Sequence, residues 1–333
     1  MRRRQVLAAL GALLPAGCLG AKRPDTSTGG VRTEGSAPQL TATPTATPEP
    51  TDTPEPTATP EPTDTPEPGP SDDEVDAGDD AIERVQSEFA DAVEAYTGDD
   101  DGALTDVSVS NREFDVRAVL LAIDAVQHEL AAAEAAAVTD DQHDTVSDLR
   151  VAERFLTRAA LAHSYFVESV DRLDAARAAF SEELDEVETA EDRFDATLDR
   201  GSESVSTLKN DVDAEPVAAA DPFDDETYDE TVSAFESVRS VLESASSGLD
   251  RMVQGLDELE EAREEEDDGN DDEAEELSDE ALDLFDEGWE FFDDAVDAAD
   301  DIEADDLESL LEELREIADE KYRTADDLHE DVS

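Results

Sequence analysis

Three polar residues, His163, Arg177 and Glu191, stand fourteen residues apart within a long apolar pattern of the chain. An imidazole, a guanidinium and a carboxylate at one helical position could pair with a facing helix and form a ligand site or a switch. Polar residues on an apolar seam more often specify the register of packed helices, and an arginine can extend its charged end into solvent. We therefore expect register or solvation from these residues, with a ligand site as the alternative.

Two histidines, His128 and His163, fall on neighbouring expected helices and are the candidates for a metal site. Metal sites in ferritin-like bundles use Glu-x-x-His pairs. No histidine of this chain has a glutamate three residues before or after it. The acidic stretches 99–102 and 267–271 do not have the ligand spacing of an EF-hand. We expect neither a metal nor another cofactor.

Catalytic motifs are absent from the sequence. It contains no Gly-x-Ser-x-Gly elbow and no glycine-rich phosphate loop, and its one cysteine is Cys18, close to the N-terminus. We therefore predict that the protein is not an enzyme. An aromatic group, Phe285, Trp289, Phe291 and Phe292, is wider than one helix face needs, so we expect core packing for most of it and a partner-docking patch as the alternative.

The N-terminus has the pattern of an export signal. Arginines at positions 2–4 precede an apolar run over 6–14, which is too short to span a bilayer, and the segment ends in Pro15-Ala16-Gly17-Cys18. The Arg3-Arg4-Gln5-Val6-Leu7 stretch resembles a twin-arginine signal, and the end of the segment resembles a lipobox. A lipobox is expected to have leucine three residues before the cysteine, whereas this sequence has Pro15 there and the leucine at Leu14. The resemblance implies that residues 1–17 are removed and that a lipid on Cys18 holds the protein at the extracellular face of the cell membrane.

A low-complexity segment separates this signal from the rest of the chain. From Thr47 to Pro68 the sequence repeats Thr-Pro-Glu-Pro-Thr-Asp/Ala. Frequent proline removes backbone donors and favours extended polyproline II, which spans ~3.1 Å per residue. We expect residues 18–70 to be a disordered spacer, and its threonines are plausible O-glycosylation sites.

Composition indicates an unusual environment. The net charge is −72, from 95 acidic and 23 basic residues, and only Lys22, Lys209 and Lys321 are lysines. Molar salt reduces the Debye length to ~3 Å and would screen the repulsion. With the signal and the spacer, this composition is similar to that of a secreted haloarchaeal lipoprotein. Such a surface excludes nucleic acid as a partner, and it leaves membrane association to the lipid alone.

Helical periodicity runs through residues 71–333, which we expect to form one acidic helical domain. No proline lies between Pro70 and Pro216. The segment Gly98–Gly102 ends the first stretch of helical periodicity. Residues 104–109 alternate weakly and fit a loop or a short strand. The expected helices cover 79–97, 112–138, 149–200, a short corner near 203–213, 228–259, 277–299 and 302–328.

The 149–200 pattern has a regular 3-4 apolar spacing, which predicts a rod of ~75 Å that ends at Gly201. The expected fold is all-α, an elongated antiparallel bundle with coiled-coil-like long helices. These observations favour a non-catalytic, lipid-anchored extracellular scaffold or interaction module that has a possible extracellular protein partner. The alternative is a lipid-anchored solute- or metal-binding protein that serves a transporter. Oligomeric state is left open.

Overall fold

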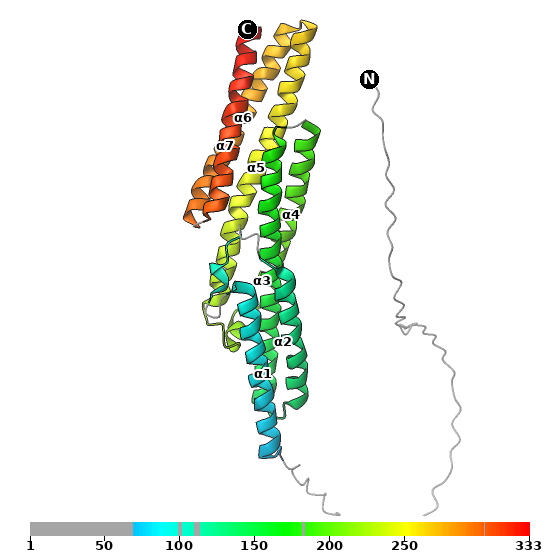
Figure 1. Cartoon of the computed structure of the whole chain (residues 1–333), viewed down its shortest axis with the longest axis vertical. Helices are drawn as coiled ribbons and strands as arrows, with labels where there is room; N and C mark the ends of the chain where they lie inside the picture. Colours follow the sequence, from blue (N-terminus) through cyan, green and yellow to red (C-terminus); the bar gives the residue numbers. More distant parts are fainter. Residues whose placement is uncertain (1–68, 99–101, 110–113, 182–183, 303) are drawn as a thin grey trace, which may run out of the picture. The chain divides into compact units, whose positions relative to one another are not determined.

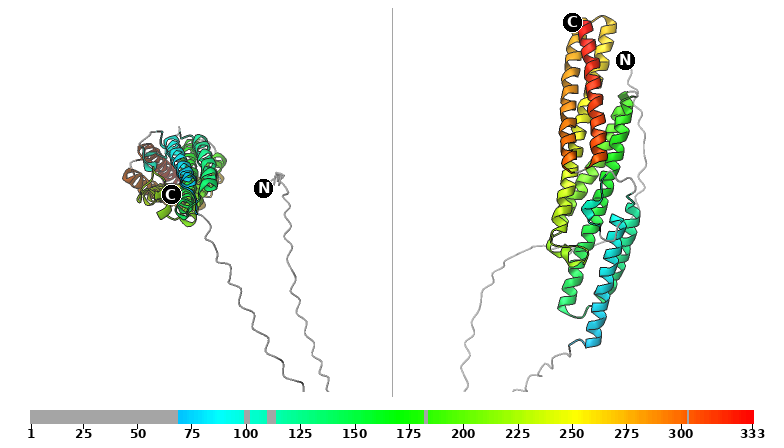
Figure 2. Two further views of the ribbon diagram at one scale, coloured as in Figure 1. Left: turned by 90° about the horizontal axis from the view of Figure 1, so that it is seen from below. Right: turned by 60° about the vertical axis from the view of Figure 1, so that its left-hand side comes forward.

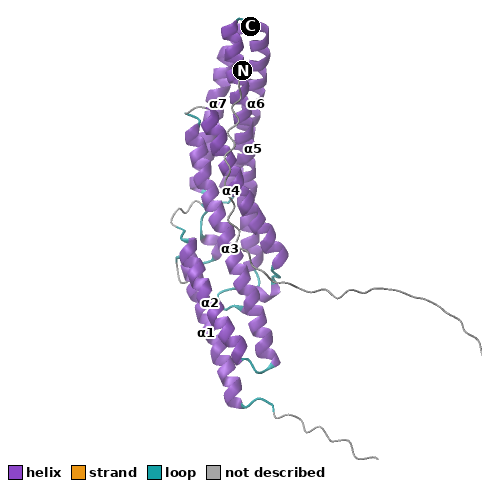
Figure 3. Ribbon diagram, turned by 90° about the vertical axis from the view of Figure 1, so that its right-hand side faces the viewer, coloured by secondary structure: helices purple, strands orange, loops and turns teal. Residues whose placement is uncertain are grey.

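The computed structural model describes residues 69–98, 102–109, 114–181, 184–302 and 304–333. Within these residues the fold is all-α, and Figure 3 shows helices joined by loops with no strand. None of the described helices is long and apolar enough to cross a membrane. The elements are α1 (Asp72–Thr97), a 3-10 turn η1 (Leu104–Asp106), α2 (Val116–Ala136), α3 (Asp140–Ala179), α4 (Leu184–Asp211), η2 (Glu215–Ala219), α5 (Thr227–Asp268), α6 (Asp271–Asp301) and α7 (Asp305–Val332).

The helices form a bundle in which successive helices run in opposite directions (Figures 1 and 2). Helix α1 packs against α2, α3 against α4, and α6 lies between α5 and α7 in sequence and packs against both. Contacts of α2 with α3 and of α4 with α5 join these groups. The antiparallel helical bundle expected from the sequence is confirmed for the described residues.

Local signals explain where several helices begin and end. Thr139 and Gln142 form a capping box at the start of α3, in which the Thr139 hydroxyl accepts from the Gln142 backbone at 3.2 Å. Gly98 and Gly269 end α1 and α5 with φ of 76° and 78°, a left-handed conformation that glycine adopts without steric cost. The acidic stretch 264–272 does not break the chain as widely as expected, since only Gly269 and Asn270 separate α5 from α6.

The expected single rod over 149–200 is wrong. The pattern belongs to two antiparallel helices, because α3 ends at Ala179 and α4 begins at Leu184 and packs back against it. The Ser181 hydroxyl donates to the Ala178 carbonyl at 3.0 Å and satisfies part of the helix end. Gly201 lies inside α4 rather than at a helix end, and the expected corner helix at 203–213 is the last part of α4.

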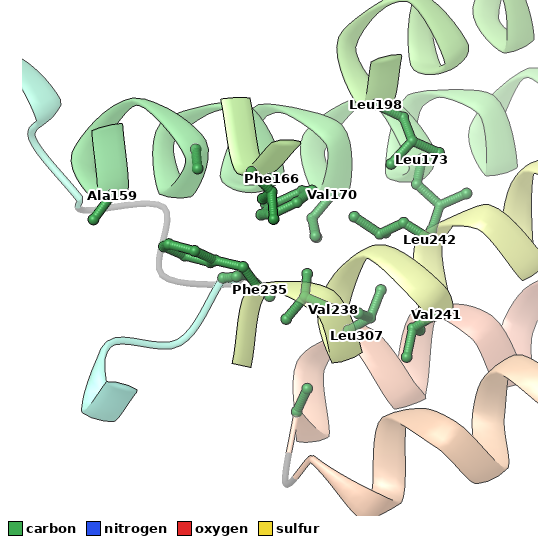
Figure 4. Close-up of a cluster of buried hydrophobic side chains, with 14 of the residues drawn as sticks. Ala159, Phe166, Val170, Leu173, Leu198, Phe235, Val238, Val241, Leu242 and Leu307 are labelled. Atoms are coloured by element: carbon green, nitrogen blue, oxygen red, sulfur yellow. The ribbon is translucent and has the colours of Figure 1, made fainter. Parts of the chain in front are cut away.

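One continuous apolar cluster fills the bundle from Ala81 in α1 to Leu328 in α7. Figure 4 shows the part in which α3, α4, α5 and α7 meet, with Phe166 and Phe235 facing each other. Their ring centroids are 5.9 Å apart. This region lies beside the segment 104–109 and the α6–α7 turn, so it brings together parts of the chain that are distant in sequence.

Candidate functional site

The motif residues of the expected export signal and anchor, Arg3, Arg4 and Cys18, lie outside the described residues. The Thr/Pro repeat over 47–68 also lies outside them. The candidate site in the described structure is therefore built from the helical bundle alone.

The three spaced polar residues, His163, Arg177 and Glu191, do not lie on one surface of one helix. His163 and Arg177 are on α3, whereas Glu191 is on α4, after the turn that the sequence pattern did not reveal. Each of the three has its own surroundings, and the structure does not combine them into a site.

Arg177 ties the end of α3 to α7. Its guanidinium lies 2.7 Å from Asp174 on its own helix and 2.7 Å from Glu313 on α7. The hydrogen bonds that Arg177 donates to Asp174 raise the pKa of Arg177, and Glu313 adds to the effect. The side chain is 32% exposed. These contacts fit the expected structural role, in which the charged end reaches the surface and fixes how two helices meet.

Glu191 lies half-buried where α4 faces α5. Burial, together with the nearby carboxylates of Asp195 and Asp250, raises its pKa to about 7. The Ser246 hydroxyl donates to Asp195 at 2.7 Å across this contact. Carboxylates that repel one another are a cost to the folded state unless a proton or salt reduces their charge.

The two candidate histidines are not brought together. His128 is exposed on α2, whereas His163 is 1% exposed in the core. No group of three or more histidine, cysteine or carboxylate side chains suited to a metal ion occurs among the described residues.

The aromatic group on α6 divides between core and surface. Phe285 and Phe292 are fully buried, as expected for core residues. Trp289 is 36% exposed and borders a cleft of about 260 Å³ with Tyr322 of α7, whose exposure is 37%. Asp286 and Asp319 line the same cleft, so the exposed aromatic surface is small and flanked by carboxylates.

His163 is held by aromatic side chains. Its Nδ1 lies 3.0 Å from the Tyr96 hydroxyl of α1. The Phe114 ring lies across the imidazole with centroids 4.3 Å apart, and Phe235 approaches it edge-on at 6.3 Å. Burial lowers the pKa of His163 to about 4, although a hydrogen bond with the Ser108 backbone partly opposes the shift. The imidazole is therefore neutral at pH 7.

A cavity of about 480 Å³ opens beside this histidine. Its walls come from four separate parts of the chain: the segment around η1, His163 of α3, the first turns of α5, and the α6–α7 turn. The lining residues are Leu104, Thr105, Val107, Ser108, Val109, His163, Thr231, Ser233, Ala234, Phe235, Ser237, Val238, Ile302 and Ala304. All the described lining residues are uncharged, in a chain with a net charge of −72.

Specific contacts position these walls. Leu104 and Val109 are buried and anchor the segment around η1 to the core. The Thr231 hydroxyl donates to the Thr227 carbonyl at 2.7 Å and so keeps its side chain against its own helix. The Ala304 backbone donates to Ala299 at 3.1 Å and fixes the α6–α7 turn.

Sequence reasoning identified His163 but not its partners. Tyr96 is 67 residues away and reads only as an apolar position of the first helix. Thr231, Ser233 and Ser237 on α5 gave no signal, because only Thr231 is buried and hydroxyl residues are ordinary at the less buried positions of a helix.

Comparison with known proteins identified no relative. No family model, no curated protein and no solved structure matches the chain.

Proposed function

We propose that the protein is a non-catalytic, lipid-anchored surface protein of a halophilic cell, which presents an acidic helical bundle to an extracellular protein partner. The proposal combines the export signal ending at Cys18, the Thr/Pro repeat over 47–68 and the folded bundle from Asp72 to Val332. In this order along the chain, a spacer separates an anchor from a folded domain.

The observation that carries the proposal is the length and charge of the helices. Helices α3 and α5 have 40 and 42 residues, which corresponds to ~60 Å each at 1.5 Å per residue. Their outer faces are rich in carboxylates, and the chain has far more acidic than basic residues. Long faces of this kind offer an extended surface to a partner that presents arginine or lysine at direct contact, because molar salt screens charges beyond ~3 Å.

The anchor is tested by Cys18→Ser. We expect this variant to appear in the medium at full length or to remain as an unprocessed precursor, while the unchanged protein fractionates with membranes. Replacement of Ser27, which lies nine residues further along, by alanine is the control and leaves the fractionation unchanged. Membrane fractionation of Cys18→Ser that equals that of the unchanged protein contradicts the lipid anchor.

The interaction role is tested by crosslinking on intact cells. The full chain is compared with a variant lacking residues 47–68 and with one in which these residues are replaced by a Gly/Ser linker of equal length. We expect a reproducible protein partner for the full chain, loss of its crosslinks on deletion, and their recovery with the replacement. Crosslinks no more abundant than those of secreted Cys18→Ser protein contradict the proposed role.

A further inference from the structure

Helices α6 and α7 each carry an aspartate and an aromatic residue three positions apart. On α6 these are Asp286 and Trp289, and on α7 they are Asp319 and Tyr322. Residues three apart on a helix are neighbours on its surface. All four line one cleft of about 260 Å³, and the fully buried Phe285 is the fifth described lining residue.

The opposite directions of α6 and α7 set the order of these groups around the cleft (Figure 1). Counted along the two helices from the turn that joins them, Trp289 is about level with Asp319, and Asp286 is about level with Tyr322. Each ring therefore has one carboxylate on its own helix and another on the facing helix. A group that enters the cleft meets two rings and two carboxylates.

The exposure of the two rings is the second observation. The exposed large apolar side chains among the described residues are Leu121, Val138, Trp289 and Tyr322, and the last two meet in this cleft. The core below the cleft is filled by other rings of α6, since Phe285 is fully buried. Tryptophan and tyrosine are enriched at protein interfaces, because each combines a large apolar area with a polar group.

The combination of rings and carboxylates selects an organic cation. Aromatic faces attract cations, and carboxylates accept hydrogen bonds from them. An anion would be repelled by Asp286 and Asp319, and a neutral group would remove water from these carboxylates without replacing its hydrogen bonds. A metal ion is a poor fit, because the described residues hold no cluster of ligands suited to one.

Among organic cations, a guanidinium suits this cleft best. It is planar, stacks on aromatic rings, donates to carboxylates in a fork and is more weakly hydrated than an ammonium group. In molar salt only groups in direct contact retain a preference, since charges are screened beyond ~3 Å. Sites for drug-sized ligands have about 300–1,000 Å³, so a cleft of about 260 Å³ suits a single side chain better than a whole ligand.

One internal cation competes for the cleft. The guanidinium of Arg323 pairs with Asp319 one turn before it on α7, and the side chain of Arg323 is 73% exposed. An exposed pair of this spacing contributes little stability. A carboxylate has two oxygens that accept, so Asp319 can bind a second guanidinium or exchange the first for it.

We propose that the cleft between Trp289 and Tyr322 binds the guanidinium of an arginine side chain that the extracellular protein partner presents. The guanidinium packs against the two rings and donates hydrogen bonds to Asp286 and Asp319. This assignment rests on the proposed interaction role and gives that role a defined contact on α6 and α7.

The fluorescence of Trp289 reports binding directly, because it is the only tryptophan of the chain. Full-length protein in molar NaCl at pH 7 is titrated with N-acetylarginine amide and with N-acetylcitrulline amide, which has a similar shape without the charge. We expect a saturable change in tryptophan emission with the arginine probe. The citrulline probe should bind at least about fivefold more weakly, since it loses the attraction of a cation to the rings.

Variants of the other lining residues keep this reporter in place. Tyr322→Leu and Asp286→Asn, both at exposed positions, should each weaken binding of the arginine probe by about two- to fivefold. Arg323→Gln removes the competing cation and should strengthen binding by about twofold. Asp283→Asn, at an exposed position of α6 outside the described lining, is the matched control and should leave the titration unchanged.

Crosslinking on intact cells tests whether the arginine belongs to the protein partner. The full chain with both Tyr322→Leu and Asp286→Asn should lose most of the crosslinks that the unchanged chain forms, whereas Asp283→Asn should retain them. Absence of crosslinks from the unchanged chain would contradict the interaction role and the protein source of the arginine. The probe titration decides separately whether the cleft binds a guanidinium.

Several results would overturn the assignment. These are no saturable change with the arginine probe, equal binding of the arginine and citrulline probes, equal weakening by Asp283→Asn and Asp286→Asn, or undiminished crosslinks of the double variant. Tetramethylammonium binding more tightly than the arginine probe would also overturn it, because the ligand would then be a small quaternary ammonium compound.

Discussion

Glycines inside the long helices make room for aromatic rings. A Cβ atom at Gly255 of α5 would lie 2.7 Å from the Phe285 ring of α6, and one at Gly248 would lie 2.7 Å from Phe292. Gly201 of α4 has the same relation to Phe166 of α3, at 2.8 Å. Glycine within a helix costs about 1 kcal/mol relative to alanine, so these positions give up helix stability to gain close packing.

Gly255→Ala should therefore destabilise the protein. Overpacking a core costs about 1–3 kcal/mol, which exceeds the gain of about 1 kcal/mol from better helix propensity. We expect a net loss of up to about 2 kcal/mol in chemical unfolding followed by circular dichroism. Gly69→Ala, where no atom lies within 4 Å of the added Cβ, is the control. The change Gly255→Ala combined with Phe285→Leu should cost less than the sum of the two single changes, and simple additivity would contradict the contact.

Glu191 makes the stability depend on pH. Its pKa is raised to about 7 in the folded state from an ordinary value of 4.5, so the folded protein binds the proton more tightly than the unfolded chain. The stabilisation is complete below pH 4.5 and is lost as pH rises to about 7. The groups that face Glu191 are Asp195 and Asp192 of α4, with Glu188 one turn before and Asp250 on α5.

Glu191→Gln should raise the melting temperature at pH 8 in low salt. The variant keeps the shape of the side chain and removes the charge, and at pH 4 the two proteins should melt at the same temperature. Because much of the side chain is exposed, we expect only about 1 kcal/mol, or about 2–4 °C. Glu186→Gln, at an exposed position of the same helix, is the control. A melting temperature of Glu191→Gln that stays below that of the unchanged protein at pH 8 would show that the carboxylate stabilises the fold.

At the scale of elements, a glycine predicted some helix ends correctly but not all of them, since Gly201 lies inside α4. Gly98 and the acidic stretch around Gly269 marked the ends of α1 and α5 in this way. The turn between α3 and α4 contains neither residue. The 3-4 apolar spacing continues across it because both helices turn their apolar faces to the same core, so periodicity alone could not reveal the reversal.

The cavity was beyond sequence reasoning for a related reason. Its walls combine residues near 104, 163, 231 and 302, and only His163 had a chemical signal of its own. The pairing of Tyr96 with His163 depends on how α1 packs against α3, and periodicity does not encode the choice of neighbour.

The helical hairpin of α3 and α4 can be tested with spin labels. Labels at Glu168→Cys and Glu203→Cys, in a Cys18→Ser background, lie two positions from Phe166 and Gly201, which are in contact. Double electron–electron resonance should give a distance of about 20 Å, because the helix axes are ~10 Å apart and each label lies ~5 Å from its axis on the far side of the contact. A single continuous helix would place the labels ~50 Å apart, and that distance would contradict the hairpin.

At the scale of the molecule, charge and packing oppose each other. Like-charged carboxylates meet between helices at Glu191 with Asp250 and at Glu258 with Glu280, and burial together with this repulsion raises the pKa of both Glu191 and Glu258. The apolar cluster that runs through the bundle supplies the opposing stabilisation, since burying apolar surface is the dominant favourable contribution to folding. Salt weakens the repulsion and leaves the apolar packing in place, so it shifts this balance toward the folded state.

We therefore expect stability to rise steeply with salt. The Debye length falls from ~10 Å at 0.1 M to ~3 Å at 1 M, which screens repulsion between helices but leaves the apolar core intact. Thermal unfolding of the full chain in NaCl from low to molar concentration should show an increasing melting temperature, with most of the gain below about 1 M, where screening changes fastest.

Sucrose, which strengthens burial without screening charge, is the control and should give a smaller gain at low salt. Equal gains from sucrose and NaCl would assign the effect to apolar burial and contradict charge repulsion as the dominant cost. A variant with Glu191→Gln and Glu258→Gln should be less dependent on salt than the unchanged protein, because two of the repulsive contacts between helices have been removed.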